Sequence, residues 1–88
     1  MFIASIVMAQ VSKQEKQVLL DLYTATNGLA WNVQWDLEKP VDTWYGITVE
    51  NNNVTGINLL FNNLNGVLPS SLGNLKNLKK LELSFNPV

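Results

Sequence analysis

Side chains that could do chemistry are few in this chain, because its 88 residues include no His and no Cys, and the commonest general base and zinc ligand are therefore missing. Four carboxylates gather in one stretch, namely Asp36, Glu38, Asp42 and Glu50. Carboxylate pairs can hydrolyse a glycoside or hold calcium, but these four lack the spacing of a metal-binding loop, and neither a GxSxG motif nor a phosphate-binding glycine loop is present. The sequence therefore predicts no catalytic residue, no metal and no cofactor, and we interpret the acids as surface residues.

The charge balance excludes one class of partner. Six Lys and seven acids give a net charge of −1 and are spread along the sequence, so no basic patch could follow a nucleic-acid backbone. A chain with 47% hydrophobic and 15% charged residues is expected to form one small folded domain. We predict no nucleic-acid partner.

The elements that organise the chain follow from a repeat near its C-terminal end. Residues 54–64 match residues 78–88 at a constant offset of 24 (78 − 54). The matched pairs are Val54 and Leu78, Ile57 and Leu81, Leu59 and Leu83, Asn62 and Asn86, and Leu64 and Val88. A fixed period of this length is typical of stacked repeat architectures.

Each copy predicts a short strand followed by a turn. Ile57 and Leu59 lie two residues apart and so share one face of a strand. Asn62 and Asn86 follow the strands, and an Asn side chain can satisfy the backbone groups of a tight turn. An extended piece and a short helical turn then lead to a new parallel strand, and their repeat positions are Leu64, Leu68, Pro69, Leu72 and Leu75.

This unit resembles a leucine-rich repeat. The segment NNLNGVLPSSLGNLKNLKKLELSFN is similar to the plant-type subclass found in receptor-like kinase ectodomains, polygalacturonase inhibitors and many bacterial surface proteins. The resemblance covers residues 54–88 and implies an α/β solenoid, the start of a leucine-rich repeat horseshoe, with parallel strands stacked at a 24-residue period. We predict repeat 1 at 54–77 and a truncated repeat 2 at 78–88.

The first residues have two interpretations. The apolar run from Phe2 to Ala9 has small residues at Val7 and Ala9, as before a signal-peptidase cut, which predicts a remnant of a signal peptide at 1–9 and a secreted or cell-surface protein. No Lys or Arg precedes the run, so a hydrophobic extension packed on the domain, in a cytoplasmic protein, is the alternative. A membrane-spanning helix needs about 20 apolar residues, so membrane association is expected only through parts not present here.

Residues 10–53 are predicted to form an N-terminal cap that begins with a helix over 12–26. Ser12 and Glu15 have the spacing of a capping box, and Asn27 before a Gly provides a left-handed stop. The apolar stripe expected to face the core consists of Val18, Leu22 and Ala25, with Leu19 and Tyr23 beside it.

A loop over 29–44 carries all three Trp residues, Trp31, Trp35 and Trp44. A solenoid leaves the apolar interior of its first coil open, and large aromatic side chains can close it, each burying about 150–250 Å². We therefore interpret the loop as a lid over the core. An aromatic sugar-binding platform is the alternative.

Residues 45–50 and 54–59 alternate on both sides of an Asn-rich turn, which predicts a β-hairpin between the cap and the first repeat. The cap resembles the one that precedes plant-type repeats, whose motif is CxWxGVxC. Residues 44–47 match the WxGV part, but Asp42 and Val49 occupy the two Cys positions. The resemblance therefore implies a cysteine-free variant of the cap, without its disulfide.

The resemblance also implies a binding surface on the open face of the sheet. In the family, the Leu positions hold the fold, and the outward positions bind proteins, peptides or glycans. The candidates here are Asn58, Leu60, Lys80, Glu82 and Ser84. We predict a non-catalytic recognition module, the N-terminal part of a longer leucine-rich repeat surface or receptor-like protein.

Two other functions stay open. The segment could position an enzymatic domain, for example a kinase, that follows Val88, or serve as its sensor. It could also be a self-assembling structural repeat, because the last strand leaves Leu78, Leu81 and Leu83 uncovered and its edge free to pair with another chain. Stable solenoids need about three or more repeats, so we expect a longer protein and self-association of this fragment through its open C-terminal edge.

Overall fold

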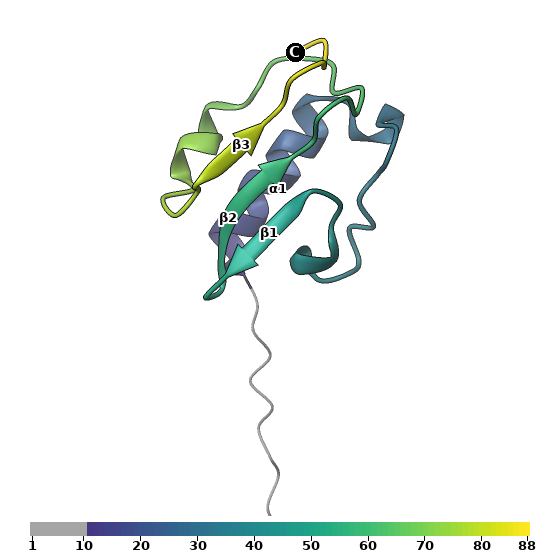
Figure 1. The fold of residues 1–88 in the computed structure, drawn as a ribbon. Helices are drawn as coiled ribbons and strands as arrows, with labels where there is room; N and C mark the ends of the chain where they lie inside the picture. Colours follow the sequence, from purple (N-terminus) through teal and green to yellow (C-terminus); the bar gives the residue numbers. More distant parts are fainter. Residues whose placement is uncertain (1–10) are drawn as a thin grey trace, which may run out of the picture.

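One helix lies behind a three-stranded sheet in the computed structural model, which describes residues 11–88 (Figure 1). Helix α1 spans Lys13–Ala25, and the strands are β1 (Ile47–Glu50), β2 (Asn53–Asn58) and β3 (Lys80–Glu82). Three short 3-10 helices are η1 (Gly28–Ala30), η2 (Val41–Thr43) and η3 (Ser70–Asn74). The signal-peptide interpretation concerns residues 1–9, which lie outside the described residues. Within residues 11–88, no helix has the length and apolar character needed to cross a membrane.

Helix α1 begins and ends close to the predicted positions, but its first turn is capped differently. The Ser12 hydroxyl oxygen accepts a hydrogen bond from the Glu15 N–H at 3.2 Å. The Glu15 carboxylate does not complete a capping box. It accepts instead from the N–H of Val54 at 2.7 Å, and so ties the start of the helix to the start of β2. Asn27 has the predicted left-handed conformation, with φ +56°.

The buried stripe of α1 differs from the predicted one at its last position. Leu19, Leu22 and Thr26 are fully buried, whereas Ala25 is exposed. Thr26 lies four residues after Leu22, so it continues the stripe along the helix axis. Its hydroxyl donates to the carbonyl of Leu22 at 2.6 Å, which explains how a polar side chain is accommodated there.

The predicted hairpin is present, with β1 and β2 antiparallel. Asn51 and Asn52 both have positive φ (+51° and +64°), as a two-residue type I′ turn requires. The register skips Thr55, because Thr48 faces Gly56 while the next pair is Val49 with Val54. Because of this bulge, Val54 and Ile57 both face the core although they lie three residues apart on β2. In a regular strand, side chains three residues apart point to opposite faces.

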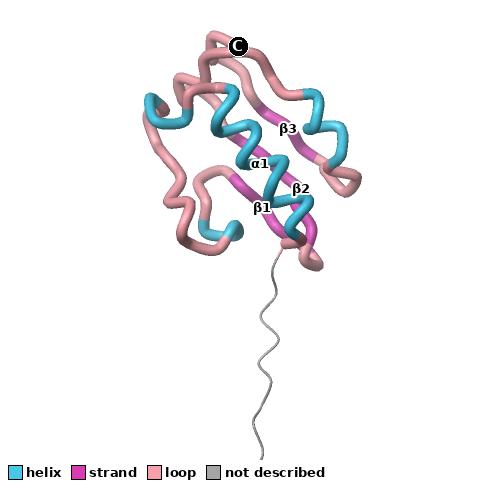
Figure 2. Tube along the Cα trace, turned by 180° about the vertical axis from the view of Figure 1, so that it is seen from behind, coloured by secondary structure: helices cyan, strands magenta, loops and turns pink. Residues whose placement is uncertain are grey.

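Strand β3 adds to β2 in parallel, giving the sheet order β1-β2-β3. The pairing joins Gly56 to Lys80, Ile57 to Leu81 and Asn58 to Glu82, so each partner lies 24 residues further along the chain (80 − 56). The two copies of the sequence repeat therefore stand side by side. Figure 2 shows α1 in front of the strands when the molecule is seen from behind.

The three Trp side chains close the core, as the lid interpretation predicts. Trp31, Trp35 and Trp44 are each 3–4% exposed, and the rings of Trp35 and Trp44 stack with centroids 4.8 Å apart. Each indole N–H donates to a backbone carbonyl, namely that of Thr26, Tyr45 or Lys39. Since the rings are covered and their polar atoms are used, they form no sugar-binding platform.

Asn62 and Asn86 hold the turns that follow β2 and β3. The buried Asn62 amide accepts from the N–H of Val33 at 2.7 Å and donates to the carbonyl of Val33 at 3.0 Å. The Asn86 amide oxygen accepts from the N–H groups of Asn62 and Leu64, at 2.8 and 3.0 Å. Its nitrogen donates to the carbonyls of Leu59, Leu83 and Ser84. Each amide thus joins its own turn to the preceding segment of the chain.

Truncating the Asn62 side chain tests this contribution. Asn62→Ala leaves the N–H and carbonyl of Val33 without their partner at a partly buried position, so we expect the free energy of unfolding to fall by about 1–3 kcal/mol. Urea denaturation followed by Trp fluorescence measures the change. The control is Asn77→Ala, at an exposed position, with an expected change within about 0.5 kcal/mol. Equal effects in the two variants would contradict the proposed role of the amide.

The end of α1 is pressed against the first repeat at Gly66. This residue has φ +144°, and a Cβ atom there would collide with the carbonyl oxygen of Ala25. The neighbouring Asn65 N–H donates to the carbonyl of Thr26 at 3.1 Å. The close approach of the two backbones therefore requires glycine.

A matched pair of glycine substitutions tests this approach. We expect Gly66→Ala to lower the free energy of unfolding by about 2 kcal/mol or more, because both the contact and the backbone angle oppose a side chain. Gly73→Ala is the control, since its Cβ would meet no atom within 4 Å. Thermal unfolding followed by circular dichroism compares them, and an unchanged midpoint for Gly66→Ala would refute the close approach.

Candidate functional site

The open face of the sheet lies opposite α1, as the two views from front and back show. The residues predicted for this face, on β2, β3 and the segments that follow them, are Asn58, Leu60, Lys80, Glu82 and Ser84. All are exposed except Glu82, which is partly buried. The parallel pairing puts Asn58 beside Glu82, and the N–H of Phe61 donates to the carbonyl of Ser84 at 3.0 Å. The structure therefore brings the five predicted residues onto two neighbouring segments.

Local hydrogen bonds hold the polar side chains of this face. The Glu82 carboxylate accepts from the N–H of Ser84 at 2.9 Å, and the Ser84 hydroxyl also favours its charged form. The Asn58 amide oxygen accepts from the N–H of Leu60 at 3.3 Å, two residues on in the same way. The Ser84 hydroxyl and N–H bonds, assisted by the charge of Lys80, lower the pKa of Glu82 below its ordinary value. A fixed negative charge thus lies on the face close to a lysine.

The predicted repeat positions differ in how well they are covered. Fully buried are Val54, Ile57, Leu59, Leu64 and Asn62, while Leu75 is 5% exposed. Partly buried are Pro69, Leu72, Leu78, Leu83 and Asn86. Leu68 and Leu81 are 38% and 47% exposed. Leu81 pairs with the buried Ile57, so its exposure comes from the side of β3 that no described residue covers.

The acidic residues between positions 36 and 50 do not gather into a site. Among residues 11–88, no three side chains of the metal-binding types lie close enough to hold an ion. Glu50 pairs with Lys79 at 3.2 Å, but both side chains are largely exposed. An exposed ion pair of this kind contributes about 0–1 kcal/mol to the stability of the fold. It does not indicate a reactive site.

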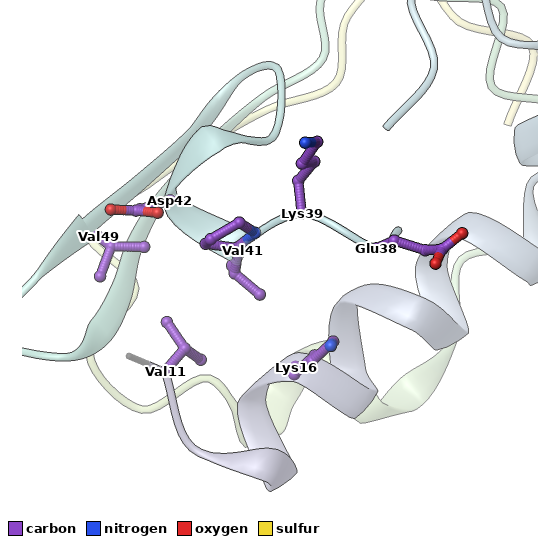
Figure 3. Close-up of a pocket in the computed structure, with 8 residues that line it drawn as sticks. Val11, Lys16, Glu38, Lys39, Val41, Asp42 and Val49 are labelled. Carbon is purple, nitrogen blue, oxygen red and sulfur yellow. The ribbon is translucent and has the colours of Figure 1, made fainter. Parts of the chain in front are cut away.

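A cavity of about 210 Å³ lies between the start of α1, η2 and β1 (Figure 3). Val11, Val41 and Val49 converge on it, and the side chain of Lys39 points away from them. Asp42 and Val49, at the positions of the resembled family's capping disulfide, both line it. Its volume is below the about 300–1,000 Å³ of ordinary small-molecule sites, so we assign it to cap packing.

One feature of the surface was not predicted from the sequence. Phe61 and Phe85 are 73% and 77% exposed, and their ring centroids lie 6.2 Å apart. We call this pair the Phe row. The two residues are 24 apart (85 − 61), and each directly precedes one of the turn asparagines. The alignment of residues 54–64 with 78–88 pairs these two Phe residues. An apolar residue that recurs at the repeat period is, however, equally typical of the core.

Comparison with known proteins supports the fold. No family model matches the chain. The structure is similar to the crystal structure of a leucine-rich repeat protein from Bacteroides eggerthii, with a TM-score of 0.72 and 24% sequence identity. The match covers 89% of this chain and 14% of that one, so the chain spans a small part of the protein it resembles. The chain thus has a fold found in leucine-rich repeat proteins.

The bonds from Ser84 make a prediction about the charge of Glu82. In Ser84→Ala the hydroxyl donor is lost and the backbone donor remains, so the pKa of Glu82 should rise part of the way to its ordinary value. Because the pKa of Glu82 is lower in the folded chain than in the unfolded chain, the ionised carboxylate stabilises the fold. This stabilisation is fully present above the pKa of the unfolded chain and is lost as the pH falls through the pKa of the folded chain. An NMR titration of the Glu82 carboxyl carbon in both chains measures this. An unchanged pKa would show that the hydroxyl does not bind the carboxylate.

Proposed function

We propose that this chain is a non-catalytic protein-recognition module, the N-terminal part of a longer leucine-rich repeat surface or receptor-like protein. The observation that carries the proposal is the contrast between the two faces of the sheet. One face is filled by apolar side chains against α1, and the other presents Asn58, Leu60, Lys80, Glu82 and Ser84 to solvent. Packing does not restrict those five side chains, so they are available to a partner.

The half-covered end of the sheet supports the proposal of a longer protein. Leu81 is 47% exposed although its partner Ile57 is fully buried. A further repeat of the same kind, stacked on β3, would cover it and continue the plant-type solenoid with its 24-residue period. The similarity to a much longer leucine-rich repeat protein supports this extension. We propose a secreted or cell-surface location on the apolar run from Phe2 to Ala9, with a cytoplasmic protein as the alternative.

Selection of peptide ligands tests the recognition face without a known partner. Peptides are selected from a random phage-displayed library on the wild-type chain. They should bind the double variant Lys80→Glu, Glu82→Lys about tenfold more weakly than they bind the wild-type chain. The exchange reverses two charges on the face while the net charge stays the same. Surface plasmon resonance with the synthetic peptides measures the affinities.

The matched control is the exchange Lys13→Glu, Glu38→Lys, which reverses two exposed charges away from the face. Its peptide affinities should equal those of the wild-type chain. If the selected peptides distinguish the control but not the face variant, or if selection enriches no peptide, the open face is not a recognition surface.

A further inference from the structure

The two residues of the Phe row have an unusual backbone. Six residues other than glycine have positive φ among residues 11–88, and four of them are asparagines. The other two are Phe61 and Phe85, with φ +55° and +60°. Asn tolerates the left-handed region because its short side chain bonds locally, whereas a bulky side chain there is strained. The turn after each strand could therefore adopt this conformation at lower cost with Asn.

Burial does not offset this strain. Both rings are about three-quarters exposed, so the fold gains little apolar contact from them beyond the edge they share with each other. Large exposed aromatic side chains placed next to one another mark interaction sites. The backbone angles and the exposure are separate observations, and both indicate that the rings serve a contact outside the described chain.

The surroundings of the row define the chemistry of that contact. Residues 54–75 and 83–88 include no Asp, Glu, Lys or Arg, so both rings lie in uncharged stretches. Two further apolar residues near them in the sequence, Leu60 and Val88, are 42% and 46% exposed. The buried centres of protein–protein interfaces are rich in aromatic residues and poor in charged residues. The Glu82 carboxylate, bonded to the N–H of Ser84, is the charge beside this surface, which therefore favours an apolar side chain over an acidic one.

A glycan fits the row less well. Sugar hydroxyls need free hydrogen-bond donors and acceptors beside the rings. The amide nitrogens beside the row are already partly engaged, because Asn32 donates to the carbonyl of Phe61, Asn63 to that of Ala30, and Asn86 to the carbonyls of Leu59, Leu83 and Ser84.

A second copy of the chain also fits less well. A phenyl side chain covers about 150–250 Å², and about three quarters of that is exposed at Phe61 and Phe85. Four such rings pairing across a two-fold axis would therefore bury only about 450–750 Å² of exposed surface. A specific dimer buries about 1,200–2,000 Å². The row has the size of a site for one short segment.

We propose that the Phe row binds an uncharged peptide segment of a partner protein, whose aromatic or aliphatic side chain lies against the rings of Phe61 and Phe85. The proposal rests on the recognition function above and adds an apolar subsite to it. The row follows the ends of β2 and β3 directly, so it is continuous with the polar face through Leu60 and Ser84.

The test is an NMR titration of the ¹⁵N-labelled chain with acetyl-Gly-Phe-Gly-amide. We expect shifts at the amides of residues 60–63 and 84–86 with a Kd of about 1–10 mM, as suits a ligand of this size. Acetyl-Gly-Asp-Gly-amide and cellobiose are the competing probes. Shifts at the row from cellobiose but not from the Phe peptide would overturn the proposal in favour of a glycan. The same shifts on raising the protein concentration alone would overturn it in favour of a second copy.

The variant Phe61→Asn, Phe85→Asn removes the rings and keeps residues that accept positive φ. We expect it to melt at the wild-type temperature or higher and to bind the Phe peptide at least tenfold more weakly. Val67→Asn, which removes another exposed apolar side chain, should bind normally. A lower melting temperature for the double variant, or binding equal to that of the wild-type chain, would show that the row is not a peptide subsite.

If the library peptides still depend on Lys80 and Glu82 while the Phe peptide causes no shifts at the row, the recognition function stands and the subsite is wrong. If neither the library nor the Phe peptide binds, both proposals fail. The two conclusions are therefore separable by the same set of chains.

Discussion

The fold depends on the amide groups of Asn62 and Asn86, because the turns they occupy leave backbone N–H and carbonyl groups partly buried and without a partner in the sheet. An unpaired buried backbone group costs about 1–3 kcal/mol. Asn62 satisfies both backbone groups of Val33 in the loop after α1, and Asn86 satisfies two N–H groups of the turn after β2. The same side-chain type thus joins the loop to the turn after β2, and that turn to the one after β3.

Two further contacts place the helix on this framework. The Glu15 carboxylate accepts from Val54 at the start of β2, and Gly66 admits the backbone at the end of α1. The helix is therefore attached at its start to β2 and at its end to the segment that follows β2, and its apolar stripe meets the interior side of the sheet between them. The Trp lid then covers what the helix leaves open, using indole N–H groups that all find backbone carbonyls. No disulfide is needed for this arrangement.

Local and periodic features could be predicted from the sequence, whereas features that depend on distant partners could not. The helix, the Asn turn of the hairpin and the buried leucines follow from spacing and residue type. The partner of Glu15 lies 39 residues away, so a capping box was the natural but wrong expectation. The bulge at Thr55 arises only when β1 pairs with β2, and it alone explains why Val54 and Ile57 both face inward. The five open-face positions followed from alternation, but the Phe row did not, because exposure is a tertiary property.

Along each of the two chain segments, the polar residues of the open face come first and an exposed Phe follows in the turn. Glu82, whose carboxylate is held by the Ser84 N–H, ends β3, and Ser84 and the exposed ring of Phe85 follow in the turn after the strand. Charged groups on a surface mainly select among partners and speed encounter, while buried aromatic contacts supply most of the binding free energy. A partner lying across the strand ends would meet both within one repeat. Since Asn86 fixes the turn that carries Phe85, the amide that completes the fold also positions the ring for binding.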